Sequence, residues 1–62
     1  MDLNTASCSD LERLPGIGTV RAQDIIDWRQ EHGPFSSVDD LKKVKGIGAG
    51  VLEQILPYVK VS

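Results

Sequence analysis

An internal repeat is the feature of this sequence that most limits what the chain can fold into. Shifting the chain by thirty residues against itself brings like residues together at nearly every apolar position. The aligned pairs are Ser7 with Ser37, Leu11 with Leu41, Leu14 with Val44, Gly16-Ile17-Gly18 with Gly46-Ile47-Gly48, and Ile25-Ile26 with Ile55-Leu56. A repeat of this length encodes one supersecondary unit, and neighbouring copies bury a common core. Two half-size units with one shared core therefore explain how a chain of only 62 residues can fold.

The first copy predicts a short helix, a tight turn and a longer helix. Ser7 is a good N-cap, and Asp10 three residues later comes close to a capping box, so we expect a helix over about 8–13. The proline and glycines that follow stop this helix. Thr19 is the expected N-cap of a second helix over about 20–31.

The second copy predicts the same elements. Ser37 and Asp40 repeat the capping arrangement and favour a helix over about 38–43. The last helix is expected over about 49–58, and Pro57 should fray or tighten its final turn.

The expected class is all-α, because no alternating run of apolar residues is long enough for a strand. We expect one domain over 1–62, with a first unit over about 7–31 and a second over about 37–60, packed as a pseudo-two-fold, SAM-like helical domain. Cys8 is the only cysteine and His32 the only histidine, which excludes a disulfide framework and a Cys/His zinc site. The predicted core is Leu3, Leu11, Leu14, Ile17, Ala22, Ile25, Ile26, Phe35, Leu41, Val44, Ile47, Leu52, Ile55 and Tyr58.

Charge and composition exclude several classes of protein. The net charge of −2 argues against a simple cationic nucleic-acid binder. The sequence offers no Ser/His/Asp or Cys/His constellation and no convincing carboxylate pair, so we expect neither an enzyme nor a small-molecule substrate. No stretch approaches the roughly 20 apolar residues of a membrane span. Residues 1–7 lack the pattern of a signal peptide, and the sequence itself assigns no compartment.

The two glycine-rich turns point to a binding chemistry. A turn of this kind that leads directly into a helix exposes backbone N–H groups without internal partners, and the helix dipole favours an anion there. Glycine lets a phosphate approach the backbone closely, because it has no Cβ. Two such turns in one repeat present two phosphate sites with approximate two-fold symmetry. The backbones of duplex DNA are also related by a two-fold, which favours DNA over a single phosphorylated metabolite.

The segment Leu14-Pro15-Gly16-Ile17-Gly18-Thr19-Val20-Arg21-Ala22 resembles the helix-hairpin-helix DNA-binding motif, and Val44-Lys45-Gly46-Ile47-Gly48 resembles a second copy. Together with residues 3–7, 33–41 and 55–58, nearly the whole chain is similar to the tandem helix-hairpin-helix domain of the ComEA competence proteins. The resemblance implies binding of double-stranded DNA without sequence specificity during natural transformation, with hairpin amides on phosphates largely across the minor groove. It implies a parent protein outside the cytoplasm with a membrane anchor beyond these residues. Related hairpins sometimes hold a monovalent cation on their carbonyls; no other cofactor is expected.

The family's functional residues transfer to matching positions of this chain. The second copy departs from the pattern, because Gly50 and Val51 stand where a basic or hydroxyl residue would help. The expected DNA-contacting set is Gly16, Ile17, Gly18, Thr19, Arg21, Lys43, Lys45, Gly46, Ile47, Gly48, Ala49 and Gly50.

Two function classes stay open at this point. With about three or four cations in reach, a DNA-binding module would bind weakly, in the nonspecific range of roughly 10⁻⁴ to 10⁻⁶ M. The alternative is a protein-interaction or structural module that keeps the fold without DNA binding. The acidic balance and the uncharged start of the last helix support this alternative.

Overall fold

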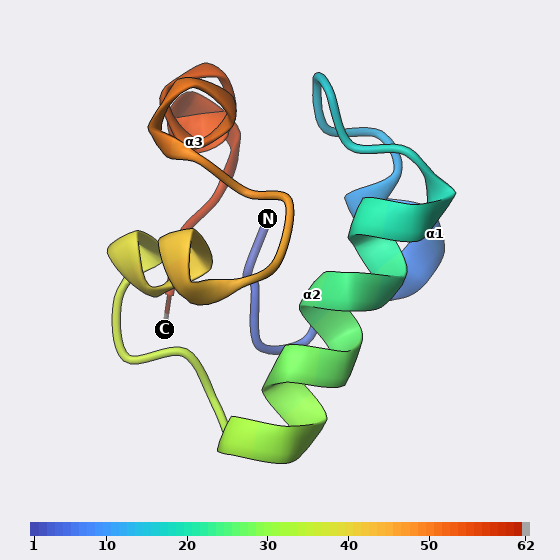
Figure 1. The fold of residues 1–62 in the computed structure, drawn as a ribbon, viewed down its shortest axis with the longest axis vertical. Coiled ribbons are helices and arrows are strands. Elements are labelled where there is room, and N and C mark those ends of the chain that lie inside the picture. The colour runs from blue at the N-terminus through green and yellow to red at the C-terminus, as the bar shows by residue number, and fades with distance from the viewer. Residues whose placement is uncertain (62) are drawn as a thin grey trace.

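Five helical segments make up the fold of residues 1–61 (Figure 1). A computed structural model describes residues 1–61. The segments are α1 (Cys8–Leu11), α2 (Thr19–His32), the 3-10 helix η1 (Val38–Lys43), α3 (Ala49–Ile55) and the 3-10 turn η2 (Leu56–Tyr58). Within the described residues, the β pairing is an isolated parallel bridge between Asp2 and Lys60 rather than a strand. The all-α class is therefore confirmed.

Several helix ends differ from the expected ones. The first helix, expected over about 8–13, ends at Leu11 with Glu12 as its C-cap. Gly18, not Thr19, is the N-cap of α2, so the helix begins one residue earlier than predicted. The segment over Val38–Lys43 has the predicted bounds but winds as a 3-10 helix. The last α-helix ends at Ile55, and Pro57 lies in the tighter 3-10 turn that follows, as its missing N–H leads one to expect.

The core follows the predicted list with two corrections and one addition. Ile26 is only partly buried at the edge of the core, because it lies one position past the buried Ile25 and so faces sideways on α2. Tyr58 is 56% exposed. The α-helical register that would bring it inward ends with α3, and the partly buried Val59 packs against the core instead. Ala6 is buried at 4% exposure and was missed by the sequence pattern.

The burial pattern repeats with the thirty-residue offset of the sequence. The buried pairs are Leu11 and Leu41, Leu14 and Val44, Ile17 and Ile47, Ala22 and Leu52, and Ile25 and Ile55. Each copy therefore uses the same set of positions to build the core.

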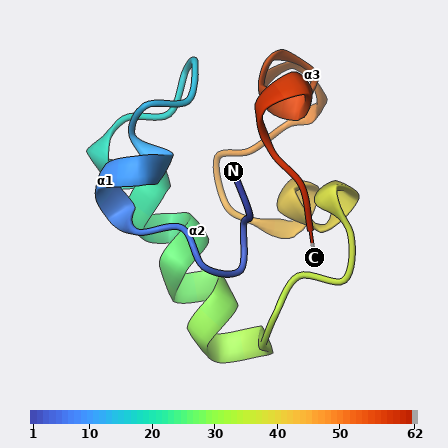
Figure 2. The same ribbon diagram turned by 180° about the vertical axis from the view of Figure 1, so that it is seen from behind.

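The N-terminal segment runs between α2 and η1, as the views from both sides show (Figure 1, Figure 2). Hydrogen bonds hold it there. Nη1 of Arg29 donates to the carbonyls of Leu3 at 2.6 Å and Ala6 at 3.1 Å. The Leu3 amide donates to the Lys60 carbonyl at 3.0 Å. These long-range bonds tie the chain together in a molecule without a disulfide.

An aromatic stack covers the end of α2. Trp28 stacks on the buried Phe35 with ring centroids 4.7 Å apart and on His32 with centroids 4.6 Å apart. Gly33, with φ of 86°, then ends the helix in a conformation that side-chain-bearing residues avoid.

None of the helices formed by residues 1–61 is long and apolar enough to cross a membrane.

Candidate functional site

The first hairpin, residues 14–18, turns the chain from α1 to α2 and forms the loop at the top right of Figure 1. Gly16 has φ of 75°, a left-handed conformation that favours glycine. The Ile17 amide donates to the Leu14 carbonyl at 3.1 Å, and the Ile17 side chain is 4% exposed. The buried isoleucine therefore anchors a turn whose glycines face solvent.

The second hairpin, residues 44–48, has the same backbone arrangement between η1 and α3. Gly46 has φ of 85°, and the Ile47 amide donates to the Val44 carbonyl at 3.1 Å. Ile47 is 3% exposed. Two turns of one local geometry thus precede two helices.

Both helices that follow the hairpins begin without a side-chain cap. Gly18 caps α2 and Gly48 caps α3, each in an extended conformation with φ of −95° and −99°. The carbonyls of these glycines accept the first helical bonds, from Ala22 at 2.9 Å and Leu52 at 3.0 Å. The first amides of each helix lack intrahelical partners, as at any helix start. No hydroxyl or carboxylate of the cap residue occupies them.

The space in front of these helix starts is open. A Cβ added at Gly18, Gly48 or Gly50 would meet nothing within 4 Å. The extended backbone at Gly18 and Gly48 does not itself require glycine. Glycine at these two positions therefore leaves open space at the helix starts rather than relieving backbone strain.

Most residues of the expected set lie at the surface. The exposed members are Gly16, Gly18, Thr19, Arg21, Lys43, Lys45, Gly46, Gly48, Ala49 and Gly50. The side chains of Ile17 and Ile47 lie in the core, so these two residues offer a ligand only backbone atoms.

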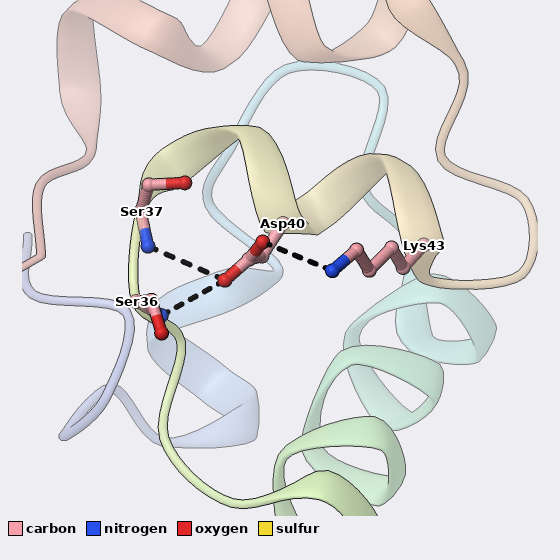
Figure 3. Close-up of polar contacts among 4 residues, drawn as sticks. All are labelled: Ser36, Ser37, Asp40 and Lys43. Carbon is pink, nitrogen blue, oxygen red and sulfur yellow. Dashed lines mark hydrogen bonds and ion pairs between the residues drawn. The ribbon is translucent and has the colours of Figure 1, made fainter.

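Lys43 is paired with an acidic side chain rather than free. Its Nζ lies 3.5 Å from Oδ1 of Asp40 (Figure 3). The other oxygen of that carboxylate accepts hydrogen bonds from the amides of Ser36 at 2.9 Å and Ser37 at 3.3 Å. The Ser36 amide is the main reason that the pKa of the Asp40 carboxyl lies below its ordinary value. Because a surface ion pair of this kind contributes little free energy, Lys43 remains available to bind a second anion.

Arg21 makes a contact that the sequence pattern did not predict. Its Nε donates to the carbonyl oxygen of Gly46 at 3.0 Å, across 25 residues of chain. A residue of α2 in the first unit therefore touches the second hairpin. The one signal in the sequence was indirect: the repeat places Val51, not a basic residue, at the position that corresponds to Arg21.

Other kinds of site are not found in the part of the chain that the structure describes. Residues 1–61 hold no group of three or more His, Cys, Asp or Glu side chains arranged around a metal position. No pocket opens on the surface of the same residues.

Comparison with known proteins identifies the family. The sequence model described as the helix-hairpin-helix motif matches residues 1–60, and the chain belongs to this family. ComE operon protein 1 of Bacillus subtilis (strain 168) is 36% identical over 61 residues, which cover 98% of this chain and 30% of that protein. The similarity to the ComEA competence proteins is thus confirmed.

Two further relatives come from proteins of other kinds. A deoxyribonuclease of Thioalkalivibrio sp. (strain K90mix) is 53% identical over 55 residues, covering 89% of this chain and 14% of that protein. The human S1 RNA-binding domain-containing protein 1 is 36% identical over 62 residues, covering 100% of this chain and 6% of that protein. The chain spans less than a third of the length of each of these three relatives.

Proposed function

We propose that this domain binds double-stranded DNA without sequence preference, with the backbone amides of the two hairpins on phosphates. The observation that carries the proposal is the pair of hairpins with matching backbone hydrogen bonds, Ile17 to Leu14 and Ile47 to Val44, each at 3.1 Å. Each hairpin leads into a helix that has no side-chain cap and whose first residues are exposed. Such amides and the helix dipole together favour a phosphate.

The relatives support a nucleic-acid ligand. The deoxyribonuclease acts on DNA by its name, and most of this chain aligns with a small part of it. A non-catalytic module in such a protein would hold the nucleic acid while another part performs the chemistry. The name of the S1 RNA-binding domain-containing protein 1 makes RNA the ligand to compare with DNA in the test.

The net charge of −2 limits affinity without opposing this function. Arg21 and Lys45 lie at the hairpins, whereas Asp24, Asp27 and Glu31 lie further along α2. Affinity depends on the number of phosphates that cations neutralise, and few cations are in reach here. We therefore expect a Kd of roughly 10⁻⁴ to 10⁻⁶ M at physiological salt, with low sequence specificity because phosphate contacts carry no base information.

The test is a titration of ¹⁵N-labelled protein with two DNA duplexes of unrelated sequence, followed by amide NMR shifts. We expect saturable shifts confined to residues 16–21 and 45–50, of similar size for both duplexes. An RNA duplex of matched length tells whether the helical form of the nucleic acid is discriminated. If millimolar DNA produces no shifts, or shifts only elsewhere, the proposal is wrong. The protein-interaction module, which the 74% exposed Val20 beside the first hairpin favours, would then be the better assignment.

A glycine substitution tests the amide mechanism itself. Alanine at both Gly18 and Gly48 is compatible with the backbone and meets no neighbour, so the free energy of unfolding should change by less than about 1 kcal/mol. The added methyl groups occupy space at the starts of α2 and α3 that a phosphate would approach, so DNA affinity should fall about tenfold. Gly33→Ala is the matched control. It strains a left-handed position far along α2 and should lower stability while leaving DNA affinity unchanged. Full affinity in the Gly18→Ala, Gly48→Ala variant would contradict the amide mechanism.

A further inference from the structure

The second hairpin has no basic residue of its own unit in the helix that follows it. Its own repeat carries Val51 where the first repeat carries Arg21, so no basic residue follows the turn in α3. The guanidinium of Arg21 nonetheless reaches this hairpin from the first unit, because Nε donates to the Gly46 carbonyl at 3.0 Å.

The contact covers a face of the turn rather than a single atom. A Cβ built on Gly46 would lie 3.5 Å from Nε and 3.7 Å from Cγ of Arg21. The aliphatic stem and the head of Arg21 therefore both lie against the second hairpin.

The peptide group between Gly46 and Ile47 is held at both ends. Its carbonyl accepts from Arg21, and its amide donates to Val44 at 3.1 Å. In the first hairpin the Ile17 amide makes the same bond to Leu14, but within residues 1–61 no donor lies on the Gly16 carbonyl. The orientation of one peptide plane in the second hairpin is thus fixed by a side chain of the other unit.

At Gly16 of the first hairpin, the position that corresponds to Gly46, the neighbouring side chain is not a cation. The nearest neighbour of a Cβ on Gly16 is the neutral Oε1 of Gln54, at 3.6 Å. Arg21 is exposed, and a guanidinium carries five N–H donors, of which the bond to Gly46 uses one. The remaining edge matches the geometry of a phosphate.

We propose that Arg21 is shared by the two units: it positions the backbone of the second hairpin and supplies the cation that the second repeat lacks. The cation role rests on the proposed DNA function, whereas the positioning role does not. The two hairpins are then unequal. The second, with Arg21 and Lys45, contributes more of the electrostatic attraction than the first.

The experiment compares Arg21→Met, Arg21→Lys, Arg21→Gln and the charge-matched control Lys60→Gln, first without DNA. Met keeps the aliphatic stem but has no N–H donor for the Gly46 carbonyl, whereas Gln and Lys can still donate to it. Amide hydrogen exchange is measured by NMR at Ile47 and at Ile17. Arg21→Met should raise the exchange rate of Ile47 about fivefold, the factor expected for one lost hydrogen bond, and leave Ile17 unchanged. Lys60→Gln should change neither rate. Unchanged exchange at Ile47 in the Arg21→Met variant would overturn the positioning role, whether or not DNA binds.

DNA binding at several salt concentrations then tests the cation role. Arg21→Gln should weaken binding about tenfold and reduce the slope of log K against log salt by about 0.9, the value for one phosphate contact. Arg21→Lys keeps the charge, so it should keep the slope while losing about fivefold in affinity. If Arg21→Gln does not fold, Arg21→Met, which keeps the aliphatic stem, replaces it. An unchanged slope in the neutral variant would overturn the cation role. Absence of DNA binding by the unmodified protein would instead overturn the proposed function and leave the exchange result standing.

Discussion

The Asn4 side chain links the N-terminal segment to the segment that follows α2. Its side-chain oxygen accepts from the Phe35 amide at 2.7 Å, and its side-chain nitrogen donates to the Phe35 carbonyl at 3.1 Å. The amide group of one side chain thus satisfies both backbone groups of Phe35 at a partly buried position. This pairing holds the N-terminal segment against the join between the two units.

Asn4→Ala should therefore destabilise the domain. Both polar groups of the Phe35 backbone lose their partner, and a partly buried unsatisfied group costs about 1–3 kcal/mol. In a domain of this size, each kcal/mol lowers the thermal midpoint by about 4–8 °C. The midpoint is measured by circular dichroism, with Thr5→Ala, at a neighbouring exposed residue, as the control. Equal midpoints for the two variants would show that the Asn4 bonds contribute nothing.

The contacts that could be predicted from the sequence join residues close together along the chain. The contacts that were missed join residues far apart along it. Ser7 and Asp10 are three residues apart, and their capping box follows from that spacing alone. Asn4 and Phe35 are 31 residues apart, and no periodicity encodes their meeting. The same holds for Arg21 and Gly46, so the glycines of the candidate site could be predicted but the partner of its arginine could not.

At the scale of elements, the first helical segment of each unit is held by an acidic side chain at its start. The pKa of the Asp10 carboxyl is lowered chiefly by the backbone amide of Ser7, and that of Asp40 chiefly by the amide of Ser36. A lowered pKa means that folding favours the ionised carboxylate. The resulting stability is present above the ordinary pKa of about 4 and is lost as pH falls through the folded-state pKa.

Acid should therefore weaken the caps of α1 and η1. The double variant Asp10→Asn, Asp40→Asn should be less stable than the unmodified protein at pH 7, and should lose less further stability between about pH 5 and pH 2. Denaturant unfolding across this range measures both effects. The control is Glu31→Gln with Glu53→Gln, which removes the same charge without touching a cap. An equal acid-induced loss in the Asp10, Asp40 variant and the unmodified protein would contradict the assignment.

Element boundaries were predicted where one residue type fixes them. Gly33 ends α2 because it adopts a φ of 86°, which is not helical and which most other residues avoid. Pro57 tightens the turn after α3. The start of α2 was predicted wrongly because Thr19 has the better capping side chain. The chain instead places Gly18 at the cap, which leaves the amides of α2 without a hydroxyl partner.

At the scale of the whole molecule, the placement of charge matters more than its sum. The sequence total of −2 describes neither hairpin, since Arg21, Lys43 and Lys45 are exposed near them. About three phosphate contacts predict a slope of log K against log salt of about −2.7 for duplex DNA. Lys45→Gln should reduce that slope by about 0.9, and Lys60→Gln, at a residue of the terminal segment, should not. A salt-independent affinity would show that binding is not to the phosphate backbone.

The pairing of Asp2 with Lys60 bears on how larger proteins can carry such a module. The two residues lie one strand width apart, about 5 Å, and the chain passes through them in parallel directions. A host loop interrupted at this point would need to open by little more than the gap between neighbouring strands. Polypeptide that leads into Asp2 and polypeptide that continues from Lys60 would therefore meet this domain at neighbouring points on its surface.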